Sequence, residues 1–159
     1  MTKEKFMAEV RASETMLYHV AKSVLKSDAD CADAVQEALL IAYEKKNTLK
    51  KERFFQTWLT RILINECYKI CNRNKIIVPY EDYMQSGRIE EKKYSSLYQA
   101  VLDLPEELRI LVTLYYLEGF SQKEISKILE MREGTIKSRL SRARKILREK
   151  LEGEEETLC

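Results

Sequence analysis

The sequence predicts an all-α protein made of two small helical domains joined by a flexible linker. Only four Gly and two Pro occur among the 159 residues, so the residues that punctuate a strand-rich fold are scarce. Apolar residues also recur near a period of 3.6 in two separate blocks, and this helical periodicity fails between them. We therefore expect domains at residues 1–75 and 95–151, a linker at 76–94 and an acidic tail at 152–159.

The first block is expected to form a three-helix domain. Apolar residues between Phe6 and Leu25 repeat at helical spacing and predict the first helix. The segment Ser27-Asp28-Ala29-Asp30 interrupts this pattern and supplies N-caps for a second helix. A polar segment, Lys45 to Arg53, separates that helix from a third. The three helices are predicted at about residues 6–26, 30–46 and 54–72, and they can share one small core.

The second block is expected to contain four helices with a helix-turn-helix. Ser121-Gln122-Lys123-Glu124 fits a capping box, and Gly119 suits the end of the preceding helix. The linker before this block is marked by Pro79, Ser86 and Gly87 and by charges of both signs. The acidic tail is expected to be disordered, with masking of Arg142 and Lys145 as a further guess. The helices are predicted at residues 97–104, 106–117, 121–129 and 133–151.

Composition argues against a membrane protein or an exported one. The chain is 34% charged, and no window approaches the roughly 18 consecutive apolar residues of a spanning helix. The first six residues carry acid and lack an apolar signal core, so we expect a cytoplasmic protein that is not membrane-embedded.

The side chains that carry chemistry argue against an enzyme. Cys67 and Cys71 lie at i,i+4 and could form half of a metal site, but His19 is the only histidine and no CxxC occurs. We expect Cys31, Cys67, Cys71 and Cys159 to be thiols in a reducing compartment, with no metal site. Paired carboxylates, a nucleophile with its base and a Gly-rich phosphate loop are also missing from the sequence. No catalysis, cofactor or small-molecule substrate is therefore expected.

The last helix has the composition of a DNA reader. Residues 132–150 carry eight basic and two acidic side chains, a bias suited to a polyanion. At about 100° per residue, its apolar positions fall within about 80° of one another. Short polar and basic side chains occupy the opposite side, as a helix that reaches base edges in the major groove requires. A scaffold helix, a turn and a basic helix in series disfavour the alternative of a merely solvated face. The apolar positions are Ile136, Leu140, Ala143, Leu147 and Leu151.

Two faces of the first block also carry chemistry. Ala34, Val35, Ala38 and Ala42 are expected to face inward, which leaves an acidic and amide-bearing face around Leu40 that suits a basic partner. On the third helix, aromatic and basic side chains interleave from Phe54 to Lys69, as in proteins that stack unpaired bases. The alternatives are a solvated face for the second helix, and aromatic rings at Phe54 and Trp58 that only widen the core.

These segments resemble a known family. The runs Leu104 to Arg109, Glu118 to Ile125 and Gly134-Thr135-Ile136-Lys137-Ser138-Arg139-Leu140-Ser141-Arg142-Ala143-Arg144 look like region 4 of extracytoplasmic-function sigma factors of the sigma-70 family. The runs Asp33 to Tyr43 and Phe55 to Asn65 resemble region 2 of the same family. The resemblance covers about residues 28–75 and 100–151.

The resemblance implies roles for individual residues. Contacts to the promoter −35 element are expected from Thr135, Lys137, Ser138, Arg139, Ser141 and Arg142, and the exposed basic face adds Lys145. Contacts to the opened −10 element are expected from Lys50 in the loop 47–53 and from Trp58, Arg61, Asn65 and Lys69. Docking on the β′ coiled coil of bacterial core RNA polymerase is expected from Asp33, Gln36, Glu37 and Leu40.

The resulting hypothesis is a sigma factor that binds core polymerase, reads the −35 element as duplex and the −10 element as opened strand. Two weakly binding modules on one tether gain avidity when both engage a correctly spaced promoter. By analogy we also expect an anti-sigma factor, with Leu40 and Tyr43 as contacts. Two alternatives remain. The first is a stand-alone helix-turn-helix regulator, which would leave the first block without a function. The second is a protein-binding helical adaptor, for which we would expect no salt-dependent DNA affinity.

Overall fold

The computed structural model describes residues 1–77 and 95–158, and every regular element within them is helical. The chain divides into two compact units, Met1–Ile89 and Glu90–Cys159, called here the first and second units. The all-α fold with two helical regions is therefore confirmed. The predicted linker lies outside the described residues, apart from Ile76 and Ile77 in the last turn of a helix.

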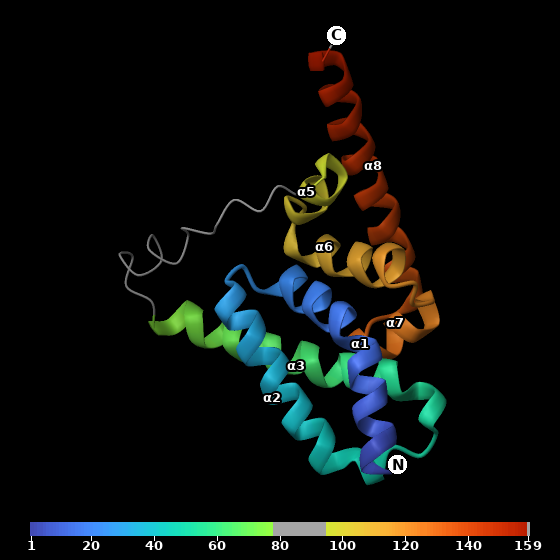
Figure 1. The fold of residues 1–159 in the computed structure, drawn as a ribbon. Coiled ribbons are helices and arrows are strands. Elements are labelled where there is room, and N and C mark those ends of the chain that lie inside the picture. Colours follow the sequence, from blue (N-terminus) through green and yellow to red (C-terminus); the bar gives the residue numbers. More distant parts are fainter. Residues whose placement is uncertain (78–94, 159) are drawn as a thin grey trace. The chain divides into compact units, whose positions relative to one another are not determined.

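The first unit contains the three expected helices, α1 (Lys3–Val24), α2 (Asp28–Lys45) and α3 (Phe55–Ile77), which pack on one another (Figure 1). The Oγ of Ser27 accepts a hydrogen bond from the backbone N–H of Asp30 at 3.3 Å, which starts α2 where the sequence predicts a cap. Two short 3₁₀ turns, η1 (Lys46–Thr48) and η2 (Glu52–Phe54), connect α2 to α3. An exposed ion pair links Lys5 of α1 to Glu52 of η2 in this connection.

Aromatic and aliphatic side chains from all three helices form the core of the first unit. The Phe6 ring of α1 meets Phe55 of α3 edge-on at 5.8 Å between centroids, and it meets Tyr43 of α2 at 5.5 Å. Leu59 and Leu63 of α3 are fully buried. Inward-facing Ala34, Val35, Ala38 and Ala42 of α2 are buried as predicted, and their small size lets α3 approach closely.

The second unit contains α5 (Ser96–Leu102), α6 (Glu106–Val112), α7 (Gln122–Leu129) and α8 (Glu133–Leu158). The three shorter helices pack against α8 (Figure 1). The predicted capping box is present at α7. The N–H of Glu124 donates to the Ser121 Oγ, and the N–H of Ser121 donates to the Glu124 carboxylate, both at 3.1 Å. Gly119 has the left-handed φ of 76° that a residue without Cβ adopts most readily.

The helix predicted at residues 106–117 changes its winding half way. Its second half is a π-helical segment, η3 (Thr113–Leu117), in which the N–H of Glu118 donates to the carbonyl of Thr113 at 3.0 Å. The wider turn is uncommon and frequently occurs at functional sites. It brings Tyr116 and Leu117 to the surface, with 49% and 43% of each residue exposed.

Two expected boundaries are wrong, and both helices run further than predicted. α3 continues past residue 72 to Ile77. Residues 152–158, expected to be a disordered tail, continue α8 to Leu158. No Pro interrupts this acidic segment, and its Glu and Leu residues favour helix, so α8 continues through Gly153.

Candidate nucleic-acid and protein interfaces

All four side chains expected to bind polymerase line one groove between α2 and α3. The groove, called here the polar groove, has a volume of about 870 Å³. Its α2 side carries Asp33 and Glu37, whereas its α3 side carries Lys69 and Arg73, so the two walls have opposite charge. Leu40 is 56% exposed and offers an apolar contact at this edge. The full lining is Asp33, Gln36, Glu37, Leu40, Glu66, Lys69, Ile70, Asn72 and Arg73.

An ion pair is built into the wall of the polar groove. The Nζ of Lys69 lies 2.9 Å from Oε1 of Glu66, one turn earlier on α3, and the Glu66 side chain is only 11% exposed. A nearly buried carboxylate is stabilised by such a charged hydrogen bond. The structure therefore places Lys69, expected at the −10 strand, at the border of the polar groove.

The remaining −10 candidates on α3 form a stripe on its outer side. Trp58 is half-buried with its ring 5.9 Å from that of Phe55, whereas Arg61 and Asn65 are exposed. Phe54, 41% exposed beneath the Arg53 guanidinium, does not widen the core. Lys50 is exposed between η1 and η2. The stripe thus offers a ring, a cation and an amide to a strand that passes along it.

The second unit contains a helix-turn-helix. Between α7 and α8, Glu130 takes a left-handed conformation with φ of 54° and turns the chain sharply. Ile136, Leu140 and Ala143 of α8 are fully buried, and α8 packs on α7, where Ile125 is fully buried. The apolar face of α8 is therefore confirmed at Ile136, Leu140 and Ala143, whereas Leu147 and Leu151 further along it are half-buried.

The predicted −35 residues differ in how far they reach out of α8. Thr135 and Arg139 are half-buried, and the Arg139 guanidinium lies 3.8 Å from the Sδ of Met131 in the turn. The Oγ of Ser138 donates to the carbonyl of Thr135 at 3.1 Å. The exposed members of the set are Lys137, Ser138, Ser141, Arg142 and Lys145.

Arg142 has a partner that the sequence did not reveal. Its Nη1 lies 3.4 Å from Oε1 of Glu107, which stands in the first turn of α6. The pair links the exposed face of α8 to a neighbouring helix 35 positions earlier in the chain.

The guess that the acidic end of α8 masks Arg142 and Lys145 stays a prediction. At about 1.5 Å rise per residue, Glu152 lies roughly 10 Å along the helix axis from Lys145 and roughly 15 Å from Arg142.

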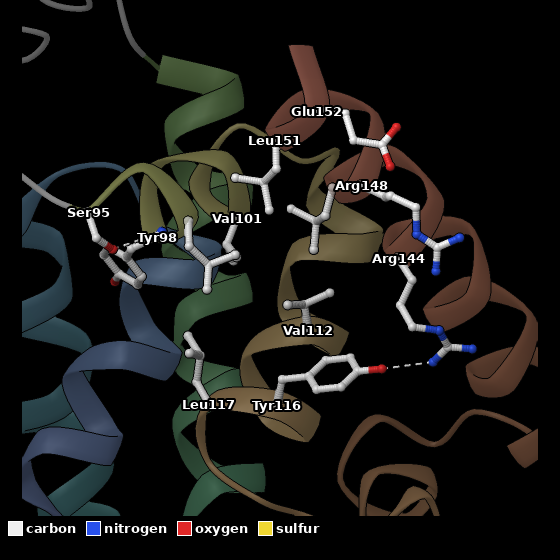
Figure 2. Close-up of a pocket in the computed structure, with 12 residues that line it drawn as sticks. Ser95, Tyr98, Val101, Val112, Tyr116, Leu117, Arg144, Arg148, Leu151 and Glu152 are labelled. Atoms are coloured by element: carbon white, nitrogen blue, oxygen red, sulfur yellow. Dashed lines mark hydrogen bonds between the residues drawn. The ribbon is translucent and has the colours of Figure 1, made fainter. Parts of the chain in front are cut away.

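A second groove, missed at the sequence level, lies beside α8 (Figure 2). This apolar groove has a volume of about 560 Å³ and gathers side chains from α5, η3 and α8. Leu97 on its rim is 53% exposed, and Arg144 donates a hydrogen bond from Nη1 to the Tyr116 hydroxyl at 2.9 Å. The exposure of Tyr116 and Leu117 could have been found only with the π-helical winding known. Its other main lining residues are Tyr98, Val101, Val112, Leu147, Arg148, Leu151 and Glu152.

The cysteines of the first unit are free thiols, of which Cys31 and Cys67 are buried in the helical core and Cys71 is half-buried. Burial raises the pKa of Cys31 to about 11 and that of Cys67 to about 12. Such thiols stay protonated and unreactive at neutral pH. Across the part of the chain that the structure describes, no three His, Cys, Asp or Glu side chains gather where they could hold a metal ion. Among those residues, no helix is both long and apolar enough to cross a membrane.

Comparison with known proteins assigns both units to one family. Residues 10–76 match the family model for sigma-70 region 2, and residues 94–147 match that for sigma-70 region 4. The chain is 30% identical over 138 residues to the ECF RNA polymerase sigma factor SigM of Mycobacterium tuberculosis, which covers 84% of this chain and 70% of SigM. It is 27% identical over 142 residues to the RNA polymerase sigma factor SigV of Bacillus subtilis, covering 87% and 86% of the two chains.

A solved structure is similar over nearly the full length. The sigma factor RpoE of Bartonella quintana, crystallised in complex with the anti-sigma factor NepR, superimposes with a TM-score of 0.75 at 28% identity. The match covers 94% of this chain and 98% of RpoE.

Proposed function

Because this chain belongs to the sigma-70 family, as an ECF sigma factor that directs transcription initiation through regions 2 and 4, we propose that its surfaces divide that work as follows. The polar groove of the first unit docks on core RNA polymerase, the outer stripe of α3 holds the opened −10 strand, and α8 reads the −35 duplex. The protein acts in the cytoplasm, as a non-enzymatic initiation factor.

The polar groove is the observation that carries this proposal. A stand-alone regulator needs a DNA-reading helix but has no use for a preformed groove that collects Asp33, Gln36 and Glu37 around exposed Leu40. A helix of the polymerase β′ coiled coil with basic residues beside an apolar one matches the α2 wall. The opposite wall, with Lys69 and Arg73, favours an acidic residue on the other side of that helix.

The stripe on α3 is suited to unpaired bases rather than to duplex DNA. Stacking on an aromatic ring contributes roughly 1–3 kcal/mol per base, and Trp58 is the ring that the stripe presents. Arg61 supplies a cation for a phosphate, and Asn65 can hydrogen-bond a base edge. Lys50 stands in the preceding loop, where an extruded base would enter.

The apolar groove of the second unit is proposed as the docking site of an anti-sigma factor (Figure 2). The occupant would be an amphipathic helix whose apolar stripe covers Leu117, Leu147 and Leu151 and whose acidic residues meet Arg144 and Arg148. Charge complementarity supports this choice, because both guanidinium groups stand on one side of an apolar floor. The similarity to RpoE, which was crystallised with its anti-sigma factor, also supports it. In the first unit, Leu40 and Tyr43 would contribute to the same partnership.

Run-off transcription on a promoter library tests the sigma function. Purified bacterial core polymerase would be used with and without the full chain, and with Asp33→Arg. The matched control is Glu14→Arg, the same charge change on the exposed surface of α1, outside the polar groove. Discrete start sites that require the protein, survive Glu14→Arg and vanish with Asp33→Arg are expected. Tight duplex binding without polymerase, and no protein-dependent transcripts, would instead favour the stand-alone regulator.

A further inference from the structure

Three arginines of α8 make different contacts with the rest of the second unit. Arg139 lies back against Met131, and Arg144 donates to the Tyr116 hydroxyl at the apolar groove. Arg142 remains on the exposed face with Ser138, Ser141 and Lys145. Its guanidinium pairs with a carboxylate, that of Glu107 at 3.4 Å.

The corner between α5 and α6 fixes the backbone at Glu107. Its neighbour Leu108 is fully buried, and Leu104 before the corner is 2% exposed. The Nη1 of Arg109 donates to the carbonyls of Leu102 and Leu104, at 3.2 and 3.4 Å, and so fastens the end of α5 to the start of α6. Because α6 also packs on α8, this backbone places the Glu107 side chain beside Arg142 on the exposed face of α8.

We propose that Glu107 is a specificity-determining positioning residue that orients the Arg142 guanidinium toward one guanine of the −35 duplex. The inference rests on the proposed function of α8. An exposed arginine beside DNA is drawn to phosphates, which carry no sequence information. A fixed carboxylate holds one edge of the guanidinium and repels phosphate, and the remaining N–H donors stay available. Those donors match the O6 and N7 acceptors of guanine.

This role predicts opposite effects on affinity and on selectivity. Glu107 brings a negative charge close to the DNA, so Glu107→Gln should raise binding to duplexes of any sequence. The same change frees Arg142 to pair with phosphate, so preference for the guanine should fall. If Glu107 only repelled DNA, Glu107→Gln would change affinity and leave selectivity unchanged. If Glu107 only supported the fold, the same substitution would lower affinity and selectivity together. Both side chains of the pair are about half exposed or more, at 61% and 48%, so the fold depends little on it.

The test is transcription by core polymerase and the full chain on promoters with a randomised −35 element. Four proteins would be compared: the unchanged chain, Arg142→Ala, Glu107→Gln and the matched control Glu106→Gln, one residue away in the same turn. Arg142→Ala should flatten the preference at one base pair. Glu107→Gln should flatten the same base pair by about fivefold or more and raise transcription from non-preferred templates. Glu106→Gln should leave the preference unchanged.

Other outcomes separate this inference from the proposed function. The positioning role would be overturned if Arg142→Ala removed the preference at a base pair where Glu107→Gln left it unchanged. It would also be overturned if Glu107→Gln lowered transcription equally on all templates. If the unchanged chain supports no transcription at all, the sigma function fails instead. Selection of bound duplexes by the same four full-length proteins, without polymerase, would then still decide whether Glu107 and Arg142 act on one base pair.

Discussion

The two units are expected to unfold independently, and a pair of leucine substitutions can test this. Leu63 in the first unit and Leu140 in the second are both 0% exposed. Replacing a fully buried leucine by alanine removes apolar contacts and leaves a cavity, which destabilises a domain by about 3 kcal/mol. The first unit has some 75 helical and turn residues, for which a total stability of about 4–11 kcal/mol is typical. Leu63→Ala should therefore remove a large part of it.

Trp58 makes the assay specific to one unit. It is the only tryptophan of the chain, and its half-buried ring lies beside Phe55 in the first unit. With a urea dependence of about 1–1.5 kcal/mol per molar, Leu63→Ala should lower the midpoint of the Trp58 fluorescence transition by about 2–3 M. Leu140→Ala should leave that midpoint unchanged and shift only part of the far-ultraviolet circular dichroism transition. An equal shift of the Trp58 midpoint by Leu140→Ala would refute independent unfolding.

Three further effects follow from local geometry. Gly119→Ala places a Cβ at a φ of 76° and should destabilise the second unit by about 1 kcal/mol in urea titrations, whereas Gly134→Ala, in open space within α8, should not destabilise it. Ser121→Ala removes the capping-box hydroxyl and should lower the stability of the same unit by about 1 kcal/mol by circular dichroism. Burial raises the pKa of the Cys31 and Cys67 thiols above the ordinary value of 9.0, so both stay protonated in the folded unit where the unfolded chain already ionises them. Their contribution to the stability of the first unit should therefore be complete below pH 9 and be lost as the pH rises toward 11–12. Urea midpoints from Trp58 fluorescence would detect that loss, and a midpoint unchanged between pH 8 and 11 would contradict it.

Features encoded over a few neighbouring residues could be predicted from the sequence. The helical order, the Ser121 capping box and the left-handed Gly119 each depend on contacts within about one turn. The buried stripe of α8 also follows from spacing alone, since Ile136 and Leu140 recur at helical intervals. The clustering of Asp33, Gln36, Glu37 and Leu40 follows from their common face of α2.

Features that depend on distant packing could not be predicted. The π-helical winding from Thr113 to Leu117 arises within a segment whose apolar pattern also suits an ordinary α-helix. The pairing of Glu107 with Arg142 joins residues 35 positions apart, so helical spacing cannot predict it. The end of α8 was misjudged because a run of acidic residues is compatible both with a solvated tail and with a solvated helix.

Because α8 is continuous, it limits the insertions and deletions that this protein can accept. One unbroken helix carries the exposed Lys145 and the groove-lining Leu147 and Leu151. Deleting Ile146 would rotate everything after it by about 100° and turn the leucines away from α5 and η3. Inserting four residues there would leave a rotational error of only about 40°. The sequence of α8 can therefore change by substitution without altering the angle between the exposed basic face and the face that lines the apolar groove. A single insertion or deletion between the two segments changes that angle.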